Sequence, residues 1–336
     1  MSTPPAHVMI ADFIPSEDPL TQERAALEGV ADVIALDCTD ENELHGKIED
    51  ADAIIVYHTI PMISAHTIKR LNKCRVIARG GVGFDNIEHN FARSKGIPVT
   101  NVPDYGTEEV ADSAIGMTLS LARGIGMYNS RLRHGLHDPW MYTLAQPLHR
   151  LRGRVFGIVG LGRIGTAAAV RAKALGMDVV FYDPYKPHGH DKALGIRRVD
   201  SLNELLNQSL VVSLHCPCTD ETTHLINQQT IDQMTPGAFL VNTARGFVVD
   251  IASPPEALAS GHLAGVGLDV LPAEPPDQNH PLLVAWRDPN HPAYHRLIIN
   301  PHAAFYCEEG LQELRRKVAE TCRRAILGQP EVNVIN

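Results

Sequence analysis

Three side chains in the second half of the sequence have the types needed for proton transfer to a carbonyl compound: Arg245, Glu274 and His302. They stand after short apolar runs, in the stretches NTARG, GLDVLPAEP and INPHAAF. Imidazole exchanges protons near neutral pH, and a neighbouring carboxylate favours its protonated form. A guanidinium offers a planar pair of donors to a carboxylate or a carbonyl oxygen. We expect His302 to exchange the proton and Arg245 to hold the substrate.

Each of these three residues also has a structural interpretation. His302 is one of seventeen histidines and could be a hydrogen-bonded structural residue. Glu274 could be a solvated loop charge, and Arg245 part of an inter-strand ion pair. Their positions after successive predicted strands favour the chemical interpretation, because ligands of open parallel sheets lie beyond the carboxyl ends of the strands.

A glycine-rich loop precedes these residues in the stretch VGLGRIG. Gly160, Gly162 and Gly165 follow the G-x-G-x-x-G order between an apolar strand and the helical stretch TAAAVRAKALG. The first glycine permits a tight turn, the second lets backbone approach a pyrophosphate, and the third lets the helix pack on the strand. Asp183, at the end of the next strand, would accept ribose hydroxyls and repel a 2′-phosphate. The pattern predicts NAD rather than NADP, and the alternative is a structural turn with a solvated aspartate.

The stretch RGGVGFDN contains a second glycine cluster, Gly80, Gly81 and Gly83. It lacks the third glycine and the following acid of a dinucleotide loop. Its backbone amides could instead hold a carboxylate.

The elements that must position these groups are short strands alternating with amphipathic stretches, the pattern of parallel βαβ units. Five strands are expected between residues 7 and 102, and six more between 154 and 301. One long helix that bridges the two domains is expected at residues 107–135. An amphipathic final helix is expected at residues 308–327 and should pack on the first domain. The Pro- and His-rich residues 274–296 most resemble a linker.

Composition favours a globular enzyme with a small ligand. The 336 residues suggest two domains, with 44% hydrophobic and 21% charged residues. A formal net charge of −9 and scattered basic residues argue against nucleic acid as a partner. Neither a leader pattern nor a long apolar run is present, so no membrane partner and a cytoplasmic location are expected.

The six cysteines have no metal-site or disulfide spacing, which fits reduced thiols. Cys216-Pro217-Cys218 could be a metal or redox pair, but buried free cysteines are more common. No metal site is predicted.

The chain resembles the D-isomer-specific 2-hydroxyacid dehydrogenases, and most of all their C-terminal binding protein branch, which includes NAD-sensing transcriptional corepressors. The resemblance rests on these stretches in family order: RGGVGFDNI, NVPDYGTEEVADSAIG, GIVGLGRIG, VVFYDPY, GAFLVNTARG, GVGLDVLPAEP and NPHAAFY. It implies an α/β protein with a Rossmann-type NAD-binding domain at residues 105–304. This domain is inserted into a smaller flavodoxin-like substrate domain at 1–104 and 305–336, with a cleft between the two.

The resemblance also implies roles for individual residues. Arg245 would orient the substrate, Glu274 would pair with His302, and His302 would be the proton donor. Cofactor contacts are expected at Gly160, Gly162, Arg163, Ile164, Gly165, Asp183, Cys216, Pro217, Thr222, Thr243, Ala244, Arg245, Asp269 and His302. Substrate contacts are expected at Arg79, Val82, Gly83, Arg245 and Phe305. A homodimer is implied, with the helix after Thr107 as its contact.

The chain departs from the family pattern in three places. Phe247 replaces a common glycine and would stiffen or narrow the approach to Arg245. Residues 275–296 are longer than in compact members, which would alter a lid or a subunit contact. Phe305 replaces the tryptophan of the corepressor branch; an aromatic wall there favours an apolar substrate side chain, unless Phe305 is simply a core residue.

The sequence thus predicts an NAD-dependent dehydrogenase of D-2-hydroxy acids that works as a 2-oxo acid reductase. A corepressor-like regulator that senses NAD(H) is the alternative from another class. The long extension of such regulators is expected to be absent, because the sequence ends at EVNVIN. Within the enzyme class, a glyoxylate or hydroxypyruvate reductase is the alternative, which Phe305 disfavours. The sequence does not name the acid.

Overall fold

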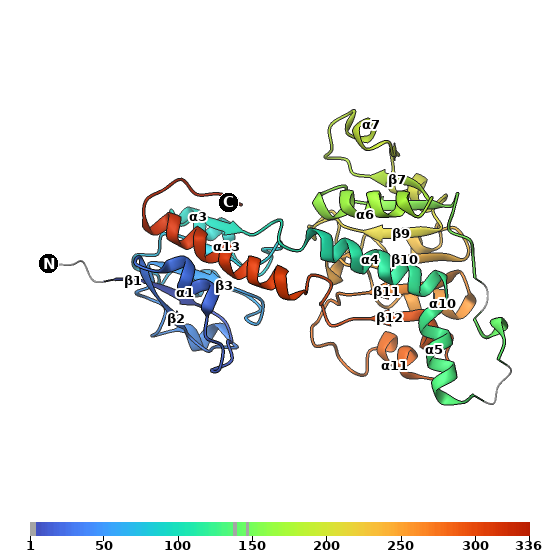
Figure 1. Cartoon of the computed structure of the whole chain (residues 1–336), viewed down its shortest axis with the longest axis horizontal. Helices are drawn as coiled ribbons and strands as arrows, with labels where there is room; N and C mark the ends of the chain where they lie inside the picture. The colour runs from blue at the N-terminus through green and yellow to red at the C-terminus, as the bar shows by residue number, and fades with distance from the viewer. Residues whose placement is uncertain (1–4, 137–139, 146–147) are drawn as a thin grey trace. The chain divides into compact units, whose positions relative to one another are not determined.

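The structure is a computed structural model that describes residues 5–136, 140–145 and 148–336. The chain divides into two compact units, one made of residues 1–106 and 306–336 and the other of residues 107–305. The expected domain boundaries, after residues 104 and 304, differ from these divisions by two residues and one residue. Figure 1 shows the elements of each unit.

The first unit is built around a parallel five-stranded sheet with the order β2-β1-β3-β4-β5. This is the strand order of flavodoxin-like folds. Its strands are β1 Ala6–Ile10, β2 Ala31–Ala35, β3 Ala53–Val56, β4 Ile77–Arg79 and β5 Val99–Asn101. Its helices are α1 Thr21–Leu27, η1 Glu41–Leu44, α2 Ala65–Ile68, α3 His89–Ser94 and α13 Glu308–Ile326.

The final helix, α13, packs against α1 and against β3 and β4 of this sheet (Figure 1). Its apolar face repeats every four residues, with Leu314, Val318 and Cys322 buried. Its N-terminus is capped by Cys307, whose sulfur accepts a hydrogen bond from the Gly310 N–H at 3.1 Å. Elements from both ends of the sequence therefore share one core.

The second unit contains a parallel seven-stranded sheet with the order β8-β7-β6-β9-β10-β11-β12. Its first six positions have the Rossmann order, in which the chain reverses direction across the sheet between β6 and β9. The strands are β6 Val155–Val159, β7 Asp178–Tyr182, β8 Arg197–Arg198, β9 Val211–Leu214, β10 Ala238–Asn242, β11 Leu263–Leu268 and β12 Leu297–Ile299. All six predicted strands are present, and the short β8 adds a seventh.

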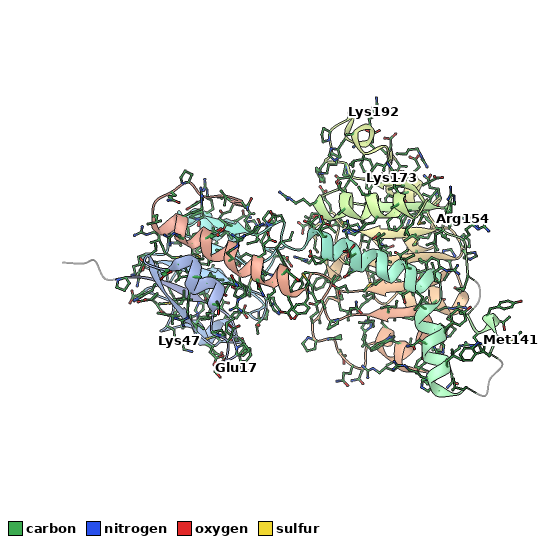
Figure 2. The ribbon with its side chains drawn as sticks, viewed as in Figure 1. Glu17, Lys47, Met141, Arg154, Lys173 and Lys192 are labelled. Carbon is green, nitrogen blue, oxygen red and sulfur yellow. The ribbon has the colours of Figure 1, made fainter. Side chains whose placement is uncertain are left out.

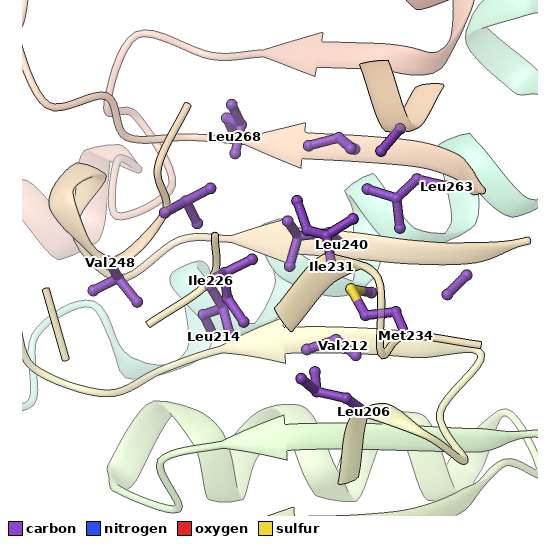
Figure 3. Close-up of a cluster of buried hydrophobic side chains, with 14 of the residues drawn as sticks. Leu206, Val212, Leu214, Ile226, Ile231, Met234, Leu240, Val248, Leu263 and Leu268 are labelled. Carbon is purple, nitrogen blue, oxygen red and sulfur yellow. The ribbon is translucent and has the colours of Figure 1, made fainter. Parts of the chain in front are cut away.

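Helices cover both faces of this sheet. They are α4 Thr107–Ala122, α5 Ile125–His134, η2 Tyr142–Leu144, α6 Arg163–Ala174, α7 His190–Leu194, α8 Leu202–Leu206, α9 Gln228–Ile231, η3 Gly246–Val248, α10 Pro254–Ser260, α11 Pro281–Arg287 and α12 Ala293–Arg296. Neighbouring strand residues face opposite cores: Phe239 packs with Phe156 and α4, whereas Leu240 packs in the cluster shown in Figure 3. Both faces are buried, which explains the continuous apolar runs of these strands.

Two predictions about elements were wrong. Residues 107–135 form two helices, because Gly124 adopts a left-handed backbone with φ +62° between α4 and α5. Residues 274–296 are not a linker, because they form α11 and α12 and bury Leu282, Leu283 and Ala293 in the core of the second unit.

Charged side chains such as Lys47, Lys173 and Lys192 lie on the outside of their units (Figure 2). Within the described residues, no helix is both long and apolar enough to cross a membrane.

Candidate active site

His302 and Glu274 meet in the second unit, where Nδ1 of His302 lies 2.7 Å from Oε2 of Glu274. Oε1 of Glu274 accepts the Leu271 N–H at 2.9 Å. Burial acts to raise the pKa of Glu274, but the hydrogen bonds from His302 and Leu271 and the charge of Arg245 hold it below its usual range. An ionised carboxylate only accepts hydrogen bonds, so Nδ1 carries a proton. Nε2 is therefore the nitrogen that can exchange a proton with a ligand.

The backbone of His302 is held in an uncommon conformation by Asp269. His302 has φ +54°, in the left-handed region that few non-glycine residues adopt. The Asp269 carbonyl accepts the His302 N–H at 2.7 Å, and its two carboxylate oxygens accept the N–H groups of Ala303 and Ala304, each at 3.0 Å. Asp269 is 1% exposed, and burial raises its pKa despite these hydrogen bonds. The end of β11 thus fixes the loop that carries the histidine.

Arg245 follows β10, and its loop packs tightly against the loop that carries Glu274. A Cβ atom on Gly246 would lie 2.0 Å from the carbonyl carbon of Leu271, so only glycine fits there. The loop is shaped by buried Asn242, whose Nδ2 donates to the Arg245 carbonyl at 2.9 Å and whose Oδ1 accepts the Ala244 N–H at 3.0 Å. Nη1 of Arg245 donates to the Ala244 carbonyl at 2.7 Å.

The two unusual aromatic residues of the site have different environments. Phe305 is half-buried and lies edge-to-face with His302, with ring centroids 6.3 Å apart. This places an apolar wall beside the candidate proton donor. Phe247 is 52% exposed, and its carbonyl accepts the His224 N–H at 2.7 Å.

The glycine loop after β6 has the three distinct environments that the motif requires. Gly160 has φ +89°, and a Cβ there would lie 2.7 Å from the Cys216 nitrogen. A Cβ on Gly165 would lie 2.2 Å from the Gly160 carbonyl oxygen. A Cβ on Gly162 would meet nothing within 4 Å, so this glycine leaves open the space that a pyrophosphate would fill. Exposed Arg163 and half-buried Ile164 begin α6 beside it.

Asp183 lies beside this loop and is oriented by it. One carboxylate oxygen accepts the Leu161 N–H at 2.9 Å, and the other accepts the Tyr185 N–H at 3.0 Å. Each oxygen keeps a second lone pair for a ribose hydroxyl. Among the described residues, Oγ1 of buried Thr243 has no hydrogen-bond partner, which is the kind of atom that a bound ligand would satisfy. These features fit a dinucleotide.

The loop after β9, residues 215–222, forms the other wall of this region. The side chain of Thr222 accepts the Thr219 N–H at 2.8 Å and donates to the Pro217 carbonyl at 2.6 Å, which closes a compact turn. Burial raises the pKa of Cys216 to about 11, so its thiol is neutral. Burial lowers the pKa of His215 to about 4, so this histidine is uncharged as well.

In the first unit, Arg79 is the last residue of β4 and is hydrogen-bonded to the loop that follows the strand. Its Nε donates to Oδ1 of Asn86 at 3.1 Å, and its Nη1 donates to the Gly80 carbonyl. The Val82 carbonyl accepts from Nδ2 of Asn101 at 2.7 Å. Within the described chain, no carbonyl or side chain accepts from the N–H groups of Val82 and Gly83. Two amides and a guanidinium thus gather at one strand end.

Residues 115–304 match the family model described as the NAD-binding domain of D-isomer specific 2-hydroxyacid dehydrogenases. The chain belongs to this family. The matched residues contain the glycine loop, Asp183, Arg245, Glu274 and His302, and NAD is the cofactor of this domain.

Two curated relatives are similar in sequence over nearly the whole chain. A D-3-phosphoglycerate dehydrogenase of Methanocaldococcus jannaschii is 35% identical over 95% of this chain and 58% of the relative. C-terminal-binding protein 1 of Caenorhabditis elegans is 34% identical over 91% of this chain and 42% of the relative. The chain thus spans about half the length of these two curated relatives. The structure of D-lactate dehydrogenase from Aquifex aeolicus with NAD and lactic acid is similar, with 29% identity, a TM-score of 0.81 and 96% coverage of each chain.

Two residues that hold strand-end loops in the structure were not singled out from the sequence. Asn242 holds the Arg245 turn, and its position before the turn in NTARG is a detectable signal, because asparagine side chains cap their own turns. Buried Asp12, which follows β1, accepts the N–H groups of Tyr57 and Thr59 at 3.1 and 3.2 Å. No spacing in the sequence indicates that contact.

Proposed function

We propose that the protein is an NAD-dependent D-2-hydroxyacid dehydrogenase that reduces 2-oxo acids, with His302 as the proton donor. The hydrogen bond between Glu274 and Nδ1 of His302 carries this proposal, because it orients Nε2 for proton exchange. The names of the similar proteins support a substrate with a 2-hydroxy acid group.

The residues would share the work as follows. NADH, when bound, supplies a hydride to the substrate C2 carbon. Nε2 of His302 gives a proton to the carbonyl oxygen as it becomes an alkoxide, so one hydride and one proton convert the 2-oxo acid into the 2-hydroxy acid. Glu274 stabilises the imidazolium before transfer, and Arg245 orients the carboxylate and polarises the carbonyl.

The remaining assignments concern recognition. The amides of Val82 and Gly83, with Arg79, would bind the substrate carboxylate. Phe305 beside His302 would favour an apolar substrate side chain over the small polar groups of glyoxylate or hydroxypyruvate. Thr222, Thr243, Ala244 and Asp269 would complete the contacts to the cofactor around the glycine loop.

We also propose a homodimer that works in the cytoplasm. No residue of α5 is buried, and Ile125, Trp140 and Tyr142 are 57%, 77% and 76% exposed. A second copy of the chain would cover these apolar groups. Six free cysteines fit a reducing compartment. Sedimentation equilibrium of the purified chain tests the dimer.

The experiment that tests the function is a panel of 2-oxo acids with NADH, followed at the nicotinamide absorbance. At least one acid should be reduced faster than about one turnover per second. The His302→Ala variant should lose this activity and keep the NADH dissociation constant of the wild type within about threefold.

Two results would contradict the proposal. Equal turnover by His302→Ala and the wild type would rule out the proton-donor role. NADH binding by the wild type without turnover of any acid would favour the alternative function, an NAD(H)-sensing regulator.

A further inference from the structure

The strand order places three loops together where the adenosine half of a dinucleotide would bind. β6 lies between β7 and β9, so the loops after β7 and β9 flank the glycine loop after β6. The reversal of strand order between β6 and β9 creates the crevice in which ligands of such sheets bind. Asp183 lies in the loop after β7, and Cys216 to Thr222 lie in the loop after β9.

A side-chain contact joins the two outer loops. The hydroxyl of Tyr185 donates a hydrogen bond to Oε2 of Glu221, and this contact raises the pKa of Tyr185. Tyr185 is 75% exposed and Glu221 is exposed as well, so the contact lies at the surface rather than in the core. Water competes with such a contact, which makes it easy to open.

Other hydrogen bonds hold the backbone of both loops, so the positions of Tyr185 and Glu221 are set independently of their contact. The N–H of Tyr185 donates to Asp183, and the guanidinium of Arg198 donates to the carbonyls of Asp183 and Lys186 at 3.0 and 2.8 Å. Glu221 lies inside the turn closed by Thr222. Two donors of Arg198 are thus bonded to backbone carbonyls, which reduces what this guanidinium can offer to a phosphate in the crevice.

We propose that Tyr185 and Glu221 form a clasp across the adenosine end of the NAD crevice, which the cofactor opens, and that Glu221 is a second carboxylate that excludes a 2′-phosphate. The inference rests on the proposed use of NAD. Asp183 and Glu221 approach the adenosine ribose from opposite loops. A 2′-phosphate would meet negative charge on both sides, whereas the ribose hydroxyls of NAD would donate hydrogen bonds to either carboxylate.

The two parts of the clasp can be tested separately by fluorescence titration of NADH and NADPH. Tyr185→Phe keeps the ring but removes the hydrogen bond that the cofactor must break, so both cofactors should bind about twofold to fivefold more tightly. Glu221→Gln keeps an oxygen that can accept from Tyr185 and removes the charge that would face the 2′-phosphate. Its preference for NADH over NADPH should therefore fall by about fivefold, and Tyr185→Phe should leave the preference unchanged.

A control variant and the wild type together distinguish failure of the clasp from failure of the proposed cofactor use. Glu256→Gln removes an exposed carboxylate from α10 in the same unit and should change neither dissociation constant. Absence of NADH binding by the wild type would overturn the proposed cofactor use itself. Wild-type binding of NADH, with an unchanged preference in Glu221→Gln or no tighter binding in Tyr185→Phe, would overturn the clasp alone.

Discussion

The candidate chemistry depends on a few side chains that are held by their immediate neighbours. Glu274 and His302 are 28 residues apart in the sequence and meet at 2.7 Å. Their contact is oriented by Leu271 on one side and by Asp269 on the other. The chemistry thus needs a carboxylate that stays ionised beside the imidazole, and the lowered pKa of Glu274 meets this need.

At the residue scale, we expect Glu274→Gln to reduce kcat for a 2-oxo acid by about 100-fold or more, the lower end of what positioned acid–base groups contribute. An amide does not carry the charge that stabilises the imidazolium, so kcat should fall while the NADH dissociation constant stays within about threefold of the wild type. Steady-state kinetics and NADH titration measure these two quantities. Glu256→Gln is the matched control, and an unaltered kcat in Glu274→Gln would show that the pair is only structural.

At the element scale, the turn from β6 into α6 combines packing and binding in neighbouring glycines. At Gly165 the space for a side chain is occupied by the Gly160 carbonyl oxygen, whereas at Gly162 that space is open. The same motif therefore contains one glycine required by the fold and another kept open for a ligand.

The two glycines should respond differently to the same substitution. Gly162→Ala should leave the free energy of unfolding within about 0.5 kcal/mol of the wild type and weaken NADH binding by about tenfold or more. Gly165→Ala should lower the free energy of unfolding by about 2 kcal/mol, because its Cβ would overlap a carbonyl. Urea unfolding and NADH titration measure the two effects. Wild-type NADH affinity in Gly162→Ala would mean that the pyrophosphate does not approach this loop.

At the scale of the whole molecule, the two ends of the sequence build one unit through a buried ionic network. Arg315 on α13 donates to Oε1 of Glu23 at 2.6 Å and to both carboxylate oxygens of Asp18 at 2.7 and 3.1 Å. Oε1 of Glu23, which is fully buried, also accepts the Tyr57 hydroxyl at 2.7 Å. Arg315 of α13 therefore neutralises the buried carboxylate of Glu23, which belongs to α1.

Removing the arginine should destabilise this unit strongly. Arg315→Met leaves Glu23 buried without its cation, so we expect the free energy of unfolding to fall by about 3 kcal/mol near neutral pH. The hydrogen bond with Arg315 lowers the pKa of Asp18 in the folded state, so its stabilisation is present above the usual carboxylate range and is lost as pH falls. The difference between variant and wild type should therefore shrink at about pH 3.

The neighbouring residue provides the control for this prediction. Arg316 forms an exposed pair with Glu320 on the same helix, and Arg316→Met should cost less than about 0.5 kcal/mol. Urea unfolding followed by circular dichroism compares the two variants at both pH values. Similar losses of unfolding free energy in Arg315→Met and Arg316→Met would mean that the buried network stabilises the protein no more than a surface ion pair does.

Much of the fold follows from local patterns in the sequence. Short apolar runs alternating with amphipathic stretches predicted all the strands except β8, whose two residues carry no apolar pattern. The break between α4 and α5 was missed because the apolar pattern continues across Gly124, and only the backbone conformation shows the turn. The sequence likewise placed Arg245, Glu274 and His302 in loops that follow strands, since the ends of apolar runs are visible locally in the sequence.

Tertiary structure decided what lies beside these residues. Three contacts join segments that no spacing in the sequence connects. They are the hydrogen bonds of Glu274 with His302, of Asp269 with the loop that carries His302, and of Tyr185 with Glu221. Parallel strands bring the ends of distant segments to one edge of the sheet, so such contacts depend on strand order and register rather than on neighbouring residues. The sequence by itself determined which chemical groups are available, and the packing of the sheet decided which of them meet.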